Sequence, residues 1–443
     1  MDGNYATVIS EASHLLAQSV LAQEKALTSR AQTIDGDLKE FCRQIGLGAA
    51  AEILGELSNR VTTETIAAGI DVNRRSSITY SVVFGQVKVE APYHWNRETR
   101  KSARPVLTKL GLKHQGRSVA VERALSDFGN EESFARAGER FEEHYGWEVG
   151  RTTILRVVER RAREAEAYVE ERLDRAEAEY QQPLLSRPGV QDLLVEMDGC
   201  EIRTGTLVPA RNRERTAVRK RPRRKRNEAW REVRVGLAGP LEAPEQRTYV
   251  ARMDEYPAVV RQLFSAGCDQ GLSSTTQVTA VADGGNGLRE ELDAQFVGER
   301  FVLDRCHLKG HLYETTEAQG FRDDERERRV SDLMARIDSG KARDVLAEFR
   351  AYKGHGRKRV RRLIKYLVRF IDAVHYDAFR ELGLPIGSGE VESCHRWLPQ
   401  KRLKLPGTWW HPDTVNPMLA LRVIRANGWW QDFWRDRARL AAA

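Results

Sequence analysis

The chain is 443 residues long, about three times the ~150 residues of an average domain, so two or three domains are expected. Charged residues make up 31% of the chain and hydrophobic residues 41%, and no run of ~18 apolar residues occurs, which excludes an integral membrane protein. Apolar residues spread along the whole length exclude wholesale disorder, and the net charge of +8 is compatible with a polyanionic partner.

Residues 1–76 are predicted to form a helical region, because apolar residues recur at helical spacing in two stretches separated near Asp35–Gly36. From residue 77 the apolar residues instead alternate with a period of two. This alternation predicts a β-hairpin with Gly85 in the turn. Helical patterning resumes near Arg117.

A helix-turn-helix is predicted later in the same region. Ser133 is a good N-cap for a helix over Phe134–Tyr145, and Gly146 is a stop signal. Thr152 or Thr153 can cap the helix that follows. Two helices joined by a short turn containing Gly are typical of a DNA-binding helix-turn-helix, although any two consecutive helices give the same pattern.

Two arginines, Arg151 and Arg156, begin the second of these helices and favour contact with DNA, with a solvated surface as the alternative. The helix continues to about Tyr180, and Pro183 and Pro188 mark a predicted domain boundary. Residues 77–187 are therefore interpreted as a β-hairpin plus a helix-turn-helix-like DNA-recognition region.

Residues 188–311 have the pattern of an α/β domain. An apolar strand over Leu193–Met197 is predicted to end at Asp198–Gly199, with Glu201–Leu207 as its hairpin partner. The remaining elements are strands over Arg231–Leu237 and Arg247–Met253, a helix over Tyr256–Ala266, and strands over Val278–Ala282 and Phe301–Leu303. The order strand, strand, strand, helix, strand, helix, strand predicts an RNase H-like core, a mixed sheet flanked by helices.

The core is predicted to be interrupted. Residues 312–384 are helical and highly charged, and we interpret them as an insertion. Residues 385–443 then complete the core with a Glu-bearing helix and a Trp-rich C-terminal subdomain, whose tryptophans are expected to pack in its interior.

Acidic residues follow two of the predicted strands, Asp198 after Leu193–Met197 and Asp283 after Val278–Ala282. Phosphodiester cleavage by two Mg²⁺ ions ~4 Å apart uses carboxylates held in this way, because Mg²⁺ prefers hard oxygen ligands. An Asp-Gly pair after a strand is also a common turn signal, so a third acid has to decide between a site and a turn.

The candidate third acid lies on a short helix predicted to begin near Gly389, with Ser388 as its cap. Glu390 and Glu392 both belong to this helix and point roughly 200° apart, so only one of them can face the metal ions. Spacing alone leaves the choice between them open.

The C-terminal motifs carry a family resemblance. The run at 386–393 (IGSGEVES) and the motifs after it resemble the C-terminal signature of bacterial insertion-sequence transposases of the ISKra type; these motifs are KRLK at 401–404, Trp409–Trp410, Asn416, Leu421–Arg422 and NGWW at 427–430. Residues 281–287 (VADGGNG) and 301–308 (FVLDRCHL) resemble the family's other core motifs, and 84–89 (FGQVKV) and 110–112 (LGL) its amino-terminal region. The resemblance covers most of the chain from about residue 75.

This resemblance implies a DDE transposase with an RNase H-like catalytic domain and a divalent metal cofactor. Carried over by position, Asp198 and Asp283 are its two aspartates, and Glu392 is its glutamate. These three residues are the expected catalytic residues and metal ligands, with two Mg²⁺ ions as cofactor and Mn²⁺ as a substitute. Glu390 is the main competitor of Glu392.

Three further groups near these acids have alternative interpretations. Glu196 shares a strand face with Asp198 and is a candidate fourth acid. Asp304 and His307 form an Asp-x-x-His motif that can supply a ligand or orient a phosphate, but helix capping by Asp304 is favoured slightly. A zinc site using Cys306, His307 and His311 is disfavoured, because no second pair of soft ligands follows.

Basic residues are concentrated in one segment, with ten in the sixteen residues of Arg211–Arg226. Ten neighbouring positive charges repel one another without a polyanion, so we favour DNA phosphates as their partner over a solvated loop. Lys401, Arg402 and Lys404 follow the proposed Glu392 helix and are further candidate phosphate contacts. The expected DNA-binding set from these segments and the helix-turn-helix is Arg151, Arg156, Arg219, Lys220, Arg221, Arg223, Arg224, Lys225, Arg226, Lys401, Arg402 and Lys404.

The sequence thus predicts a DNA transposase that binds the ends of an insertion sequence, cleaves them by metal-dependent hydrolysis and transfers the 3′-hydroxyl to target DNA. Its partners would be double-stranded DNA, at transposon ends and target, and at least one further copy of the chain. A structure-selective nuclease and a non-catalytic DNA-binding regulator on the same fold are the alternatives. Scattered cysteines and no secretory signal predict a cytoplasmic, nucleoid-associated protein.

Overall fold

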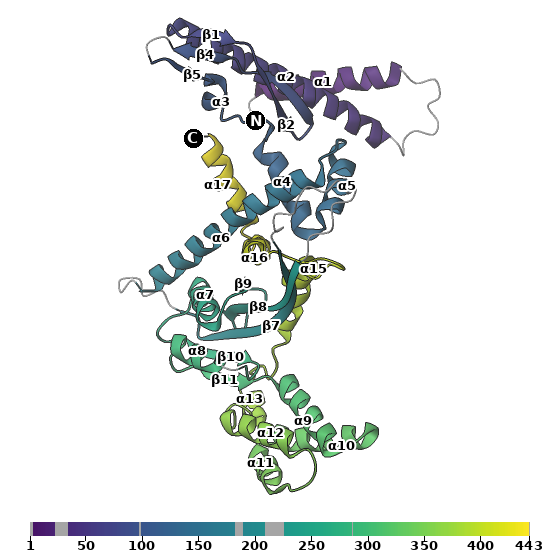
Figure 1. Ribbon diagram of the computed structural model, residues 1–443, viewed down its shortest axis with the longest axis vertical. Helices are drawn as coiled ribbons and strands as arrows, with labels where there is room; N and C mark the ends of the chain where they lie inside the picture. The colour runs from purple at the N-terminus through teal and green to yellow at the C-terminus, as the bar shows by residue number, and fades with distance from the viewer. Residues whose placement is uncertain are drawn as a thin grey trace, which may run out of the picture. The chain divides into compact units, whose positions relative to one another are not determined.

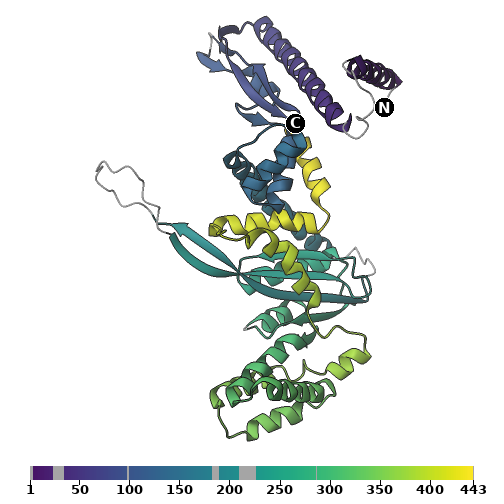
Figure 2. The same ribbon diagram turned by 90° about the vertical axis from the view of Figure 1, so that its right-hand side faces the viewer.

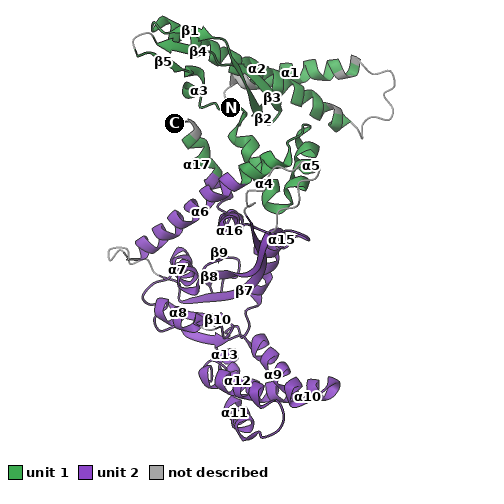
Figure 3. Ribbon diagram, viewed as in Figure 1, with its two compact units in different colours: residues 1–158, 434–443 green, residues 159–433 purple. Residues whose placement is uncertain are grey.

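The computed structural model describes residues 3–22, 34–96, 99–181, 189–208, 226–285 and 287–442. The chain is a mixed α/β protein that divides into two compact units, one of residues 1–158 with 434–443 and one of residues 159–433 (Figure 3). Helix α6 (Arg151–Gln181) begins in the first unit and ends in the second. Within the described ranges, no helix has both the length and the apolar character needed to cross a membrane.

The first unit contains two small sheets and several helices. The helices are α1 (Gly3–Ala22), α2 (Ile34–Ala67), α3 (Pro105–Lys109), α4 (Val119–Glu131) and α5 (Phe134–Tyr145). One sheet has the order β1-β4-β5, formed by Asp71–Arg74, Tyr93–Asn96 and Lys101–Ala103. The other has the order β3-β2-β6, formed by Gly85–Glu90, Ser77–Val82 and Gly116–Arg117.

The predicted β-hairpin is confirmed as β2 and β3, which pair antiparallel with Val82 opposite Gly85. Gly85 directly follows the two-residue turn and has a φ of 143°, a conformation that favours glycine. Helix α2 packs along β3 (Figure 3), and Val61 of the helix joins Ile78 and Val87 in one buried cluster. The short strands β1, β4 and β5 were not predicted.

Helix α5 is confirmed with the predicted caps. The Ser133 hydroxyl accepts a hydrogen bond from the Arg136 backbone N–H at 3.3 Å, and Gly146 ends the helix in the left-handed conformation with a φ of 71°. The predicted caps Thr152 and Thr153 are wrong, because α6 already begins at Arg151 and both threonines lie in its first turn.

The second unit is built on one five-stranded sheet with the order β11-β10-β7-β8-β9 (Figure 1). Its strands are β7 (Asp192–Leu207), β8 (Arg226–Pro240), β9 (Thr248–Arg252), β10 (Gln277–Ala282) and β11 (Arg300–Leu303). Strands β7, β8 and β9 pair antiparallel, whereas β10 and β11 are parallel to β7. The predicted order of three strands, a helix, a strand, a helix and a strand is confirmed.

The predicted hairpin within 193–207 is wrong, since β7 runs without a break through Asp198–Gly199 and pairs along its whole length with β8. Apolar and polar residues continue to alternate beyond the Asp-Gly pair, and Ile202 and Thr204 remain buried. Figure 2 shows the outer parts of β7 and β8 projecting from the sheet as a two-stranded ribbon.

Helices cover both faces of the sheet. Leu193 of β7 packs against Gly267 of α7 (Tyr256–Asp269) on one face. Glu196, which points to the other face, contacts α14 (Gly389–His395). The remaining helices of the second unit are α8 (Leu288–Gln295), α9 (Arg305–Gln319), α10 (Asp323–Asp338), α11 (Ala342–Ala351), α12 (Arg357–Arg369), α13 (Tyr376–Glu381), a π-helical turn (Arg396–Gln400), α15 (Lys401–Leu403) and α16 (Pro412–Ala426). Helix α17 (Trp430–Ala442) begins at the end of this unit, and most of it belongs to the first unit. Helices α9–α13 form the insertion between β11 and α14.

The free edge of β9 is covered by two asparagines. Asn427 forms a pair of hydrogen bonds with Tyr249, accepting from its backbone N–H at 2.8 Å and donating to its carbonyl oxygen at 3.1 Å. Asn416 accepts from the Met253 backbone N–H at 2.7 Å. Helix α16 and the residue after it thus satisfy edge groups that would otherwise be open to another strand.

Replacing Asn427 by Ala should lower the free energy of unfolding by about 1–3 kcal/mol, because the half-buried N–H and C=O of Tyr249 lose their partners. Urea denaturation would measure the change. Asn227→Ala is the matched control, because Asn227 is exposed on β8, and it should change stability by less than about 0.5 kcal/mol. Equal losses in the two variants would contradict this account of the β9 edge.

Candidate active site

Three aspartates form a row across the parallel part of the sheet. Asp198, Asp283 and Asp304 each directly follow a strand residue that pairs with the neighbouring strand. Met197 pairs with Ala282, and Ala282 pairs with Leu303 on its other side. Residues at matching register positions of parallel strands lie side by side and point to the same face. The structure therefore brings Asp198 and Asp283 together, as the sequence predicts, and adds Asp304 beside them.

Asp198 is paired with a histidine. His395 of α14 places its Nε2 atom 3.3 Å from the Asp198 Oδ2 atom, and both side chains are largely buried. Burial works against ionisation of Asp198, but the pairing with His395 holds its pKa below the usual value. Burial likewise disfavours the charged imidazole, yet Asp198 and Cys200 raise the pKa of His395 to about 9. At neutral pH the pair is therefore ionic, and no sequence motif predicted it.

Among the described residues, no cation forms an ion pair with Asp283. Burial raises its pKa, and the charges of Asp198 and Asp304 raise it further, although a hydrogen bond at 3.0 Å from the Gly285 backbone N–H and the nearby His307 oppose them. His307 lies close enough to act on both Asp198 and Asp283. The two aspartates thus form an incompletely compensated acidic pair, which suits a divalent cation.

Asp304 is fully engaged in holding two helices, and the favoured capping interpretation is confirmed. Its Oδ1 atom accepts from the His307 backbone N–H at 2.7 Å and so caps α9. Its Oδ2 atom accepts from the backbone N–H of Ser388 at 2.7 Å and from the Ser388 hydroxyl at 2.9 Å. The predicted capping of α14 by the Ser388 side chain is therefore wrong, because that hydroxyl is used by Asp304.

Glu196 caps α14 in place of Ser388. The side chain is 1% exposed, and its Oε2 atom accepts from the Val391 backbone N–H at 2.8 Å. Burial raises the pKa of Glu196 to about 8, with a smaller rise from the charge of Glu390. Glu196 thus ties β7 to the helix that carries both candidate glutamates.

The two candidate glutamates have different surroundings. Glu390 forms a two-pronged ion pair with Arg247, at 2.8 and 3.1 Å, and Arg247 is buried and also donates to three carbonyl oxygens of the β8–β9 connection. Glu392 is exposed and precedes His395 by three residues, which places it on the side of α14 that contacts Asp198. Glu392 also lies near Cys306 of α9, whose thiol pKa is raised by burial and by the charges of Asp304 and Glu392.

The predicted phosphate contacts fall into different environments. Lys401 and Lys404 are exposed, but Arg402 is 2% exposed and stacks over the Trp410 ring at 4.8 Å, so it is not placed to contact DNA. Arg151 and Arg156 are exposed on α6 in the first unit. Of the basic run, Arg226 begins β8 and contacts Glu228 and Trp409. Arg219, Lys220, Arg221, Arg223, Arg224 and Lys225 lie outside the described residues.

The expected interior packing of the tryptophans is confirmed for 410, 429, 430 and 434.

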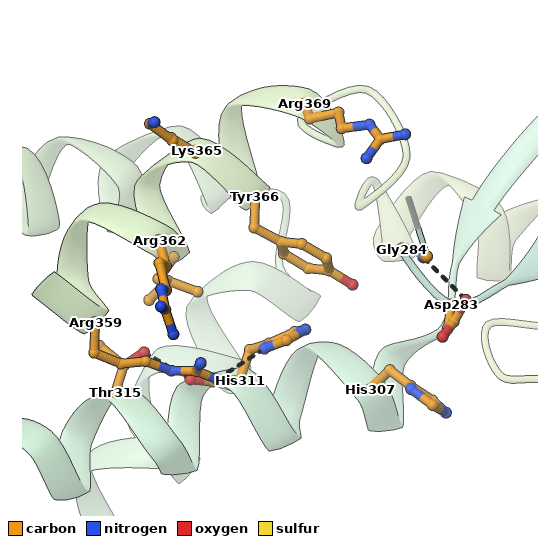
Figure 4. Close-up of a pocket in the computed structure, with 12 residues that line it drawn as sticks. Asp283, Gly284, His307, His311, Thr315, Arg359, Arg362, Lys365, Tyr366 and Arg369 are labelled. Carbon is orange, nitrogen blue, oxygen red and sulfur yellow. Dashed lines mark hydrogen bonds between the residues drawn. The ribbon is translucent and has the colours of Figure 1, made fainter. Parts of the chain in front are cut away.

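Sequence reasoning missed a basic pocket beside Asp283. A cavity of about 560 Å³ lies between α9 and α12 at the end of β10, and Asp283 forms one end of it (Figure 4). Helix α12 contributes four cationic side chains, Arg359, Arg362, Lys365 and Arg369. The signal was present in the sequence as seven Lys and Arg without an acid over residues 357–369.

Within the described residues, no group of three or more His, Cys, Asp and Glu side chains converges closely enough to hold a metal ion. Asp198 and Asp283 provide two adjacent carboxylates, and Glu392 is the nearby exposed acid. No family model matches the chain, and no curated protein matches it.

The buried Glu196 should make stability depend on pH. Its folded pKa of about 8 lies above that of an unfolded Glu, so its favourable contribution is complete below pH ~4.5 and is lost as the pH rises to about 8. In EDTA, Glu196→Gln should therefore be less sensitive than the wild type to a rise from pH 5 to 8, as measured by urea denaturation. Glu201→Gln, an exposed position on the same strand, should behave like the wild type. Parallel pH profiles for Glu196→Gln and the wild type would contradict the buried carboxyl.

Proposed function

We propose that the protein is a DDE-type DNA transposase whose active site is the edge of the sheet at Asp198 and Asp283. The observation that carries the proposal is the register of the parallel strands, which puts these two acids side by side beneath a helix bearing a further acid. A chance Asp-Gly turn does not require a matching aspartate on the next strand or a glutamate above it.

The strand order supports an RNase H-like fold for this domain. Numbered along the chain from β7, the strands run 3-2-1-4-5 across the sheet, with the first three antiparallel and the last two parallel to the first. This is the order expected of an RNase H-like core, and the insertion α9–α13 precedes the Glu-bearing helix as the family resemblance implies. The helices α5 and α6 with the turn at Gly146 support the proposed helix-turn-helix, where Arg151 and Arg156 would contact DNA.

Each group of residues at the proposed active site would have a separate role. Asp198, Asp283 and Glu392 would hold divalent ions, Mg²⁺ or its substitute Mn²⁺, and such ions stabilise charge on the attacking and leaving oxygens of a phosphodiester. Asp304 and Glu196 fix the starts of α9 and α14 to the sheet, so that the acids keep their spacing. Lys401 and Lys404 are exposed just after α14 and would contact DNA phosphates.

Glu392 is favoured over Glu390 as the third acid because of their partners. Glu390 neutralises the buried Arg247, and recruiting it to a metal ion would leave that cation unpaired. Within the part of the chain that the structure describes, no cation forms an ion pair with Glu392, which lies on the Asp198 side of α14. Joining two DNA ends would further require at least two copies of the chain on the DNA, in the cytoplasm at the nucleoid.

The test is to incubate the full chain with labelled DNA that carries the regions flanking its own gene, in the presence of Mg²⁺. Transposition predicts nicking followed by joining to target DNA, and Asp198→Asn and Asp283→Asn should reduce both by more than ~100-fold, a loss larger than that from an outer-shell partner. Nicking without joining would favour a nuclease, and binding without nicking a non-catalytic regulator.

The same assay distinguishes the two glutamates. Glu392→Gln should abolish nicking while leaving stability within about 0.5 kcal/mol of the wild type, because the side chain is exposed. Glu390→Gln should retain nicking and lose about 1–3 kcal/mol of stability, because the buried Arg247 loses its charged partner while the partly exposed Gln can still accept a hydrogen bond. Loss of nicking in Glu390→Gln with full activity in Glu392→Gln would reverse the assignment.

A further inference from the structure

Helix α12 has one strongly basic surface. Its buried side carries Val360, Leu363 and Leu367, which pack into the insertion. The rest of the helix carries cations without a single acid, namely Arg357, Lys358, Arg359, Arg361, Arg362, Lys365 and Arg369. A helix needs no such excess of one charge to pack or to remain solvated, so its cations call for an explanation.

Part of this surface lines the pocket next to Asp283. Figure 4 shows α12 and α9 as its walls, with Tyr366 directed toward Gly284 and Asp283. Gly284 allows this close approach, because a Cβ atom there would lie 2.2 Å from the Tyr366 ring. The pocket therefore reaches Asp283 of the proposed active site.

The cations of the pocket differ in how far they are compensated. Arg359 is paired with Glu314 and contacts the His311 ring at 3.2 Å, and Arg369 is paired with Glu290. Arg362 and Lys365 are exposed, and no acid among the described residues forms an ion pair with either. These two side chains lie three residues apart and so share one face of α12.

We infer that Arg362 and Lys365 bind a backbone phosphate of DNA, on the strand whose neighbouring phosphodiester lies at Asp198 and Asp283. The inference rests on the proposed function for the identity of the polyanion. Because both cations are exposed, they are better placed to bind a ligand that extends out of the pocket, such as a DNA strand, than a small anion enclosed within it. A small anion bound deeper in the pocket would also be repelled by the carboxylate of Asp283. The helical insertion thus becomes part of the DNA-binding surface.

The test measures binding of the full chain to a labelled DNA duplex by fluorescence anisotropy over a salt series, in EDTA so that no metal-dependent cleavage takes place. The double variant Arg362→Ala/Lys365→Ala should weaken binding about tenfold and reduce the slope of log K against log salt by about 1 to 2. Arg343→Ala/Arg350→Ala removes the same charge from α11 of the same insertion, at exposed positions that do not line the pocket. This control should match the wild type, and circular dichroism should show equal folding for all three.

Equal binding by the two double variants, or no binding of DNA by the wild type, would overturn the inference. Cleavage in Mg²⁺ separates it from the proposed function. A chain that binds DNA through Arg362 and Lys365 but never cuts it would support the inference and contradict the transposase. A chain that cuts and joins DNA, and that binds it equally well with and without these two cations, would support the transposase and contradict the inference.

Discussion

The buried carboxyl of Asp304 is the contact on which the geometry of the second unit depends. One of its oxygens accepts a hydrogen bond from the first turn of α9, and the other accepts hydrogen bonds from Ser388. The insertion therefore leaves the sheet and returns to it at the same point. A backbone hydrogen bond from Arg305 to Ile386 at 3.0 Å lies beside it. Because of this junction, the helices between β11 and α14 can extend without displacing the Glu-bearing helix from the sheet.

Electrostatic compensation explains how so many acids can lie at one edge. Burying like charges next to each other is costly unless each has a partner. His395 neutralises Asp198, Arg247 neutralises Glu390, and backbone N–H groups serve Glu196 and Asp304. Asp283 and Glu392 remain without a paired cation among the described residues, and these are the acids at which the proposed divalent ion would bind.

The sequence predicted the features that depend on local periodicity and missed those that depend on distant partners. The strands of the core, the cap of α5 by Ser133 and the nearness of Asp198 to Asp283 follow from alternation, capping chemistry and strand order. The Asp-Gly pair at 198–199 suggested a turn, but pairing with β8 overrides that local preference. Arg247 decides the role of Glu390 from 143 residues away, which helical spacing cannot reveal.

The most direct test of the central claim is a crystal structure of the protein grown with Mn²⁺, in which anomalous scattering locates the ions. The account predicts Mn²⁺ bound by the carboxylates of Asp198 and Asp283, with Glu392 as the third acid and Glu390 still paired with Arg247. Mn²⁺ held by Glu390 or Asp304 instead, or no Mn²⁺ between Asp198 and Asp283, would contradict it.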